Sequence, residues 1–222
     1  MIPLRRRFTN GLNERIQLSP LVRHGPLALA QACIRRATGK RPASPWIPFD
    51  AAARLESFLE RRPGARVLEY GSGMSTLWFA KHASSVIAVE SNALWAEQVQ
   101  KDLRDRRLHD KVRLVHTSVM HEYVNVSGVE PGSIDVVIVD GDHRLACGLS
   151  AFSLCRPDGL IYVDDTDKRV EVAEMAKLVD AVMAYTASVG GSCEFITDYS
   201  PAQAFPKQGL LAWLKAEEMK KC

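Results

Sequence analysis

The feature that most constrains the fold is a regular alternation of strand-like and helix-like segments, which begins at Phe49 and continues for more than about 100 residues. Residues 136–139 (Val-Val-Ile-Val) are apolar at every position, which is typical of a parallel strand covered by helices on both faces. The alternation therefore predicts an α/β fold with a doubly wound, mostly parallel sheet. Strands are expected at 66–70, 85–90, 111–116, 134–139 and 159–164, with helices between them.

The pattern changes after residue 190, where two further strands are expected at 193–197 and 210–214 without a helix between them. They predict an antiparallel hairpin that completes a seven-stranded sheet. At the other end, Gly39 and three prolines up to Pro48 separate a leading segment from the alternating region, and Asp50 is expected to cap the first helix. We expect a basic segment over residues 1–45 and one domain over residues 46–222.

Charge is distributed unevenly along the chain. Residues 1–41 hold nine Lys or Arg and one acid, a local net of +8, while the whole chain carries +3. This segment could bind an anionic membrane surface, a nucleic acid or an acidic partner; the alternative is a solvated lead-in that packs partly on the domain.

Composition excludes several classes of protein. With 46% hydrophobic and 25% charged residues, the chain is neither disordered nor fibrous. No apolar run reaches the roughly 18 residues of a membrane-spanning helix. The five cysteines have irregular spacings and no CxxC pair, which favours reduced thiols and a cytoplasmic location.

The loop after the first strand of the alternation carries the strongest functional signal. Glu69 ends this strand, and Gly71-Ser72-Gly73 form a turn into the next helix. Glycines at such a turn let the backbone approach a ligand at the carboxyl edge of an open sheet. Glu90 ends the second strand, close to the roughly 20-residue spacing at which an acid takes the ribose hydroxyls of a nucleoside.

Two features of this loop distinguish a dinucleotide from other nucleoside cofactors. The dinucleotide fingerprint requires a third glycine where this chain has Thr76, and Glu69 would repel a pyrophosphate while suiting a cationic ligand. These residues resemble the first motif of the class I S-adenosylmethionine-dependent methyltransferases, acid-x-Gly-x-Gly-x-Gly, with Ser75 at the last glycine. The Tyr-Gly-Ser-Gly-x-Ser-Thr run looks like a bacterial subgroup, and the resemblance covers about residues 50–215.

The resemblance implies a role for each binding residue. Glu69 would orient the amino acid end of S-adenosylmethionine, the Gly71–Gly73 turn would admit its methionine and ribose parts, and Glu90 would hold the ribose. The other residues implied at the cofactor are Ser72, Ser91, Asn92, Ser118 and Asp140, although Ser118 stands where the family often has Asp. The alternative for Glu69 and Glu90 is a pair of solvated strand ends.

Acidic residues follow the fourth and fifth strands of the alternation. Because these strands should be neighbours, we expect Asp140, Asp142, Asp164, Asp165 and Asp167 to converge, and carboxylates so close repel one another unless a cation intervenes. Asp140, Asp164 and Asp165 resemble the magnesium ligands of metal-dependent O-methyltransferases, with Asp165 replacing an Asn, although the usual lysine of the catechol type is not apparent. The alternatives are a metal-free methyltransferase, or an aspartate that caps the next helix.

The sequence thus predicts a methyltransferase that acts on a small-molecule or sugar hydroxyl, with His143, Asp140 and Asp142 as candidate catalytic residues and Mg2+ as a candidate metal. His143 could instead merely start a helix and bond a carboxylate. An N-methyltransferase is the first rival, but its Asn- or Asp-Pro-Pro-Tyr signature is absent. A non-catalytic nucleoside-binding module docked by its basic segment is the second. No nucleic acid partner is expected, and the oligomeric state is not predicted.

Overall fold

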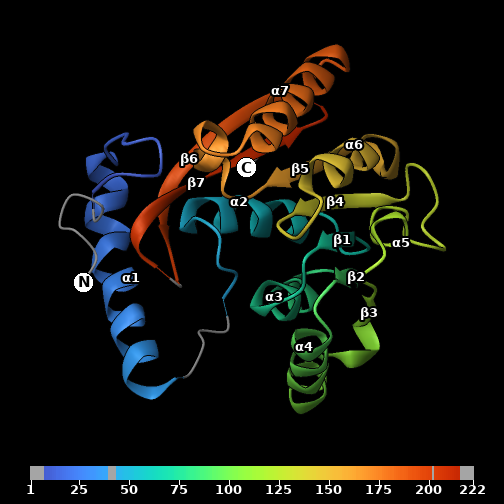
Figure 1. The fold of residues 1–222 in the computed structure, drawn as a ribbon, viewed down its shortest axis with the longest axis horizontal. Helices are drawn as coiled ribbons and strands as arrows, with labels where there is room; N and C mark the ends of the chain where they lie inside the picture. Colours follow the sequence, from blue (N-terminus) through green and yellow to red (C-terminus); the bar gives the residue numbers. More distant parts are fainter. Residues whose placement is uncertain (1–7, 40–43, 202, 216–222) are drawn as a thin grey trace.

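The computed structural model describes residues 8–39, 44–201 and 203–215. Its centre is a seven-stranded sheet in the order β3-β2-β1-β4-β5-β7-β6 (Figure 1). Strands β1 to β5 run parallel, and β7 is antiparallel to both β5 and β6. The predicted fold class is therefore confirmed. The strands are β1 (Arg66–Tyr70), β2 (Ser85–Glu90), β3 (Val112–His116), β4 (Ile134–Val139), β5 (Cys155–Val163), β6 (Ser192–Ser200) and β7 (Gln203–Trp213).

Helices cover both faces of the sheet, which explains why the central strands are mostly apolar. On one face α2 and α3 pack on the sheet around Phe58, Phe79 and Trp213, and on the other α6 and α7 pack around Cys147 and Leu178. All six residues of β4 are buried, as a central parallel strand requires. The helices of the alternating region are α2 (Phe49–Glu60), α3 (Met74–His82), α4 (Ala93–Asp105), α5 (Met120–Val124), α6 (Arg144–Leu154) and α7 (Ala173–Ser188).

Strand order reverses between β1 and β4, and the loops that follow these two strands pack closely against each other. Gly71 has φ +95°, and a Cβ atom there would lie 2.8 Å from the Cα of Gly141. A Cβ atom on Gly141 would collide with the Tyr123 hydroxyl. Only glycine fits either position, so the turn after β1 is constrained by the fold as well as by any ligand.

The leading segment contains a helix that the sequence pattern does not predict. Helix α1 (Leu18–Thr38), which contains Pro26, packs against β6 and β7. Its His24 Nδ1 lies 2.7 Å from Asp198 Oδ2, and the Asp198 side chain is fully buried. Part of the basic segment is thus docked on the domain, while residues 1–7, Lys40 and Arg41 lie outside the described residues.

Three smaller expectations concern Asp50, membrane-spanning helices and the cysteines. The prediction that Asp50 caps the first helix of the domain is wrong, because α2 begins at Phe49 and Asp50 lies in its first turn. Within the described ranges no helix has both the length and the apolar character needed to cross a membrane. The described cysteines are free thiols: Cys33, Cys147, Cys155 and Cys193.

Candidate active site

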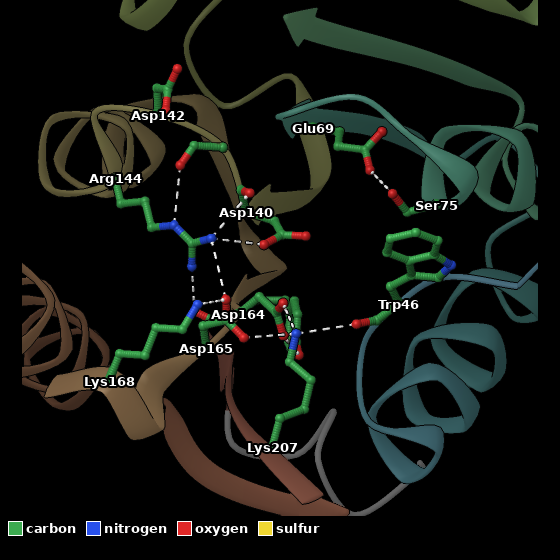
Figure 2. Close-up of polar contacts among 12 residues, drawn as sticks. Trp46, Glu69, Ser75, Asp140, Asp142, Arg144, Asp164, Asp165, Lys168 and Lys207 are labelled. Atoms are coloured by element: carbon green, nitrogen blue, oxygen red, sulfur yellow. Dashed lines mark hydrogen bonds and ion pairs between the residues drawn. The ribbon is translucent and has the colours of Figure 1, made fainter. Parts of the chain in front are cut away.

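The candidate site lies at the carboxyl ends of β1, β2, β4 and β5, where the strand order reverses. In open α/β sheets ligands bind at this position, because the loops diverge there and leave room above the strand ends. Figure 2 shows the side chains that gather here from these loops, from β7 and from the segment before α2.

Glu69 is the buried acid of the β1 end. It is 1% exposed and accepts hydrogen bonds from the hydroxyls of Ser75 and Thr76 in the first turn of α3. Burial raises the pKa of Glu69 to about 7, although the two hydroxyls oppose the shift and Glu90 adds to it. Ser75, which replaces the last glycine of the methyltransferase motif, and Thr76, which replaces the third glycine of the dinucleotide fingerprint, therefore have a common effect, since both provide donors to this carboxylate. Glu69 is not a solvated strand end.

Gly73, at the turn between β1 and α3, could carry a Cβ atom with only ordinary van der Waals contacts. Its backbone is extended, with φ 175°, and a Cβ atom there would find Ser75 Oγ nearest, at 3.8 Å. The Gly73 N–H donates to Thr76 Oγ1 at 2.9 Å, which fixes the turn. The position thus differs from Gly71, because the protein itself tolerates a larger residue at 73 and only a ligand would require glycine there.

Glu90 binds the same turn from the end of β2. Its Oε2 accepts from the backbone N–H and the hydroxyl of Ser72, both at 3.0 Å, and its Oε1 accepts from the Asn92 N–H at 2.9 Å. An ionised carboxylate offers about four acceptor positions, so one remains for a further hydroxyl. Glu90 is 8% exposed, so it too is not a solvated strand end.

The other predicted cofactor residues surround Glu90. Ser91 Oγ donates to Asp142 Oδ2 at 2.5 Å, which joins the loop after β2 to the loop after β4. Asn92 caps α4 by accepting from the Trp95 N–H at 3.0 Å. The Trp95 indole donates to the Ser72 carbonyl oxygen at 2.7 Å, a contact that the sequence did not indicate. Ser118 is exposed on the loop after β3.

The predicted convergence of the acidic residues is seen for three of them. One carboxylate oxygen from each of Asp140, Asp164 and Asp165 lies within 4.8 Å of the others. Asp142 is exposed and turns instead to Ser91, as Figure 2 also shows by its distance from the cluster. Asp167 accepts from backbone N–H groups of Gly11 and Gln208 and so holds the leading segment.

The expectation that these carboxylates lack compensation is wrong. Lys207 on β7 places its ammonium against Asp164 Oδ2 and lies 2.8 Å from Asp165 Oδ1. Arg144 Nη2 lies 2.9 Å from Asp140 Oδ1, and Lys168 Nζ lies 2.5 Å from Asp165 Oδ2. Repulsion among the three acids therefore does not by itself require a divalent ion.

The ionisation of the cluster follows from these contacts. Although burial opposes it, the ammonium of Lys207, the hydrogen bonds from Lys168 and Lys207, and Arg144 hold the pKa of Asp165 well below its usual range. Burial, and then the nearby Asp164, raise the pKa of Asp140 well above its usual range, against the opposing charges of Arg144 and Lys207. The pKa of Asp140 is thus higher than that of Asp165.

Lys207 does not stand out in the sequence, because it does not follow one of the expected parallel strands. Strand β7 runs antiparallel beside β5, so a residue in its interior reaches the carboxyl edge of the sheet. One signal was nevertheless available. Lys207 stands beside residues 209–213, which are all buried, and a buried lysine needs carboxylate partners.

His143 begins α6 with φ 50°, at the N-cap position. It is exposed, and its ring lies edge-on to Tyr123 with the centroids 5.7 Å apart. Within the described part of the chain no carboxylate forms a hydrogen bond with its imidazole. Of the alternative role, a residue that starts a helix and bonds a carboxylate, the structure therefore shows only the first part.

Trp46 connects the leading segment to the site. Its backbone oxygen accepts from Lys207 Nζ at 3.1 Å, and its ring packs with Met74 and Leu77. Arg35 of α1 lies over the same ring, 5.4 Å from the centroid.

Comparison with known proteins agrees with this geometry. Residues 68–166 match a family model described as a methyltransferase domain. An O-methyltransferase from Bacillus cereus solved with SAH is 18% identical, with TM-score 0.63 over 86% of this chain and 91% of that one. The O-methyltransferase TomG from Streptomyces achromogenes, solved with SAM, is 17% identical, with TM-score 0.58 over 85% and 89%.

A third structure, a SAM-dependent O-methyltransferase from Thermotoga maritima, is 12% identical, with TM-score 0.54 over 82% of this chain and 70% of that one. At these identities the solved structures establish the shared fold. No curated protein matches the chain. The matched residues include the turn after β1, the acid that ends β2 and both acidic strand ends. Residues 68–166 accordingly match a methyltransferase domain, and the chain shares its fold with S-adenosylmethionine-dependent O-methyltransferases of known structure.

Proposed function

We propose that this protein is an S-adenosylmethionine-dependent O-methyltransferase, that its catalytic domain spans residues 46–222, and that its acceptor is a hydroxyl of a small molecule or sugar. The observation that carries the proposal is the juxtaposition of Glu69 and Glu90 with a carboxylate of high proton affinity, Asp140, across the β1–β4 junction. The O-methyltransferases that share the fold support the choice of oxygen.

The cofactor side of the proposal rests on the two glutamates. Glu69 offers a buried negative charge, which suits the cationic amino acid end of S-adenosylmethionine. Glu90 has an acceptor position left for a ribose hydroxyl, and its bond to the Ser72 hydroxyl shows that Oε2 accepts from such a donor. Gly73 leaves the space that lets the ligand approach the backbone.

Asp140 is the group best placed to take the acceptor proton. Arg144 binds its Oδ1, while within the described residues Oδ2 has no donor; Figure 2 shows this carboxylate directed toward the side of Glu69 and Trp46. Its raised pKa suits a general base. Asp142 and His143 are the other candidates, but both are exposed, and Asp142 bonds Ser91.

The chemistry asks little of the protein beyond alignment. When bound, S-adenosylmethionine supplies a methyl group already activated by its sulfonium. The residues of the site would place the acceptor oxygen beside that methyl group, and Asp140 would accept the hydroxyl proton while the methyl group passes from sulfur to oxygen and leaves the C–S electron pair on sulfur. Positioning of this kind can supply several kcal/mol of the barrier, on the order of 7 to 11 in favourable cases.

Formation of S-adenosylhomocysteine with a panel of phenols, sugars, other alcohols and amines tests the proposal. Asp140→Asn should lower kcat by about 100-fold or more, the range of a positioned general base, while leaving KM for the cofactor within a few fold. Asp142→Asn and His143→Gln serve as matched comparisons and should cost less. If His143→Gln or Asp142→Asn gives the larger loss, that residue is the base instead. A methylated amine as the only product would reject oxygen as the acceptor atom.

A further inference from the structure

Lys207 occupies an unusual position for a lysine. It lies on β7, which is antiparallel to β5, and only 6% of its side chain is exposed. The ammonium has three N–H donors and three acceptors: Asp164 Oδ2, Asp165 Oδ1 at 2.8 Å and the Trp46 carbonyl oxygen at 3.1 Å. It is a fully bonded cation at the centre of the candidate site, as Figure 2 shows.

Charge in the cluster is balanced by the chain itself. The three carboxylates Asp140, Asp164 and Asp165 are bound by Arg144, Lys168 and Lys207. A buried ammonium is costly unless it is paired, and here two carboxylates pair it directly. Adding a divalent ion would leave the cluster with an excess of at least two positive charges in a poorly solvated place.

The carboxylate oxygens are also largely in use. Asp164 accepts from the Tyr162 hydroxyl at 2.7 Å through Oδ1 and from Lys207 through Oδ2. Asp165 binds Lys207 through one oxygen and Lys168 through the other. Magnesium and manganese need free oxygens in a near-octahedral arrangement. The donor set as it stands does not fit a divalent ion, although the three carboxylates are close enough to hold one if Lys207 were removed.

We propose that Lys207 is the resident cation of this site: its ammonium stands where a divalent ion would otherwise bind, fixes Asp164 and Asp165, and ties Trp46, at the start of the domain, to them. Methyl transfer by this protein then needs no divalent metal. Lys207 acts as a positioning residue, because it holds the side chains and the backbone that form the acceptor side. The catalytic part of this inference rests on the proposed O-methyltransferase function, but the binding part does not.

Direct binding of Mn2+, measured by calorimetry and by the loss of the free-ion EPR signal, tests the inference without any methyl acceptor. Wild type should bind Mn2+ at this site no more tightly than about 1 mM. Lys207→Met should create a site that binds at least about ten times more tightly, because it frees oxygens of Asp164 and Asp165 and removes a positive charge. The double variant Lys207→Met/Asp165→Asn should lose that site again.

Two matched variants test whether the charge of Lys207, and not the packing of its side chain, prevents Mn2+ binding. Lys207→Arg keeps the charge and should stay without a Mn2+ site. Lys168→Met removes the other lysine from Asp165 but leaves Lys207 in place, so it should gain no site either. A gain in Lys168→Met equal to that in Lys207→Met would overturn the special role of Lys207.

The wild-type protein provides a second test. Wild-type binding of Mn2+ well below 1 mM that Asp164→Asn abolishes would refute the inference, as would activity that EDTA removes and Mg2+ restores. Activity unchanged by EDTA would support it. Binding of S-adenosylhomocysteine, measured on the same samples, tests the proposed methyltransferase function separately. A negative result for the role of Lys207 therefore does not decide the proposed function, and a negative result for the function does not decide the role of Lys207.

Discussion

The pKa of Glu69 leads to a specific prediction about stability. The folded-state pKa is about 7 and the reference value is 4.5, so the native protein holds this proton more tightly than the unfolded chain. Between these two values the native state binds more protons, and the free energy of unfolding therefore falls as the pH rises. The shift of about 2.5 pH units corresponds to a cost of roughly 3 kcal/mol once Glu69 is ionised.

Glu69→Gln removes this titration while keeping the size of the side chain and one acceptor oxygen for the hydroxyls of Ser75 and Thr76. The free energy of unfolding of the variant, relative to wild type, should rise by about 2 to 3 kcal/mol between about pH 5 and pH 8. Urea unfolding at a series of pH values measures it. Glu97→Gln, at an exposed position on α4, is the matched control and should show no such trend.

The same group should couple the pH to ligand binding. If a cationic ligand binds only ionised Glu69, its affinity should fall about tenfold from pH 8 to pH 6, because the ionised fraction falls from roughly nine tenths to one tenth. The pH series in Glu69→Gln records the titration of every other group, including those of the ligand. A wild-type affinity that follows the same pH curve as the variant, or a stability difference that does not change with pH, would refute the reasoning about Glu69.

Three further predictions concern the cofactor turn and the leading segment. Glu90→Ala should weaken S-adenosylmethionine binding more than about tenfold, since a hydrogen bond to a charged acceptor contributes about 1.5 to 3 kcal/mol; unchanged calorimetric affinity in a folded variant would remove Glu90 from the site. Gly73→Ala should keep the melting temperature and weaken cofactor binding, whereas Gly71→Ala should unfold the protein at lower urea concentration; equal losses of stability would contradict this distinction. Deleting residues 1–41 should abolish any salt-sensitive attachment to anionic lipid vesicles, which full-length protein should show if the +8 segment docks there; absence of such attachment in the full chain would leave the packed lead-in as the role of this segment.

Much of the fold could be predicted from the sequence because the relevant signals are local. The apolar run of β4 and the helix periods around it report burial on both faces, and that pattern is sufficient to predict a parallel sheet with helices on each side. Glu69, Gly71, Gly73 and Glu90 were found for the same reason, since the residues that follow strands in such a sheet share one edge.

Helix α1 was not predicted, because its pattern is weak and its position depends on contacts distant in sequence. Pro26 lies inside the helix, and much of its surface, including Leu18 and Val22, is exposed. The pair of His24 with buried Asp198 and the cluster of Ile16, Ala28 and Tyr199 hold it on the hairpin. Such contacts form only after the sheet has brought residues 192–213 next to the leading segment.

The charge balance of the site likewise depends on tertiary structure. From the sequence, Asp140, Asp164 and Asp165 formed an acidic cluster with no visible partner, and a divalent ion was the natural remedy. Lys207 is separated from Asp164 by 43 positions, and only the antiparallel pairing of β7 with β5 brings the ammonium to the carboxylates. The sequence shows which ionisable residues can form the site. Whether their charges are already neutralised depends on which strands become neighbours in the folded protein.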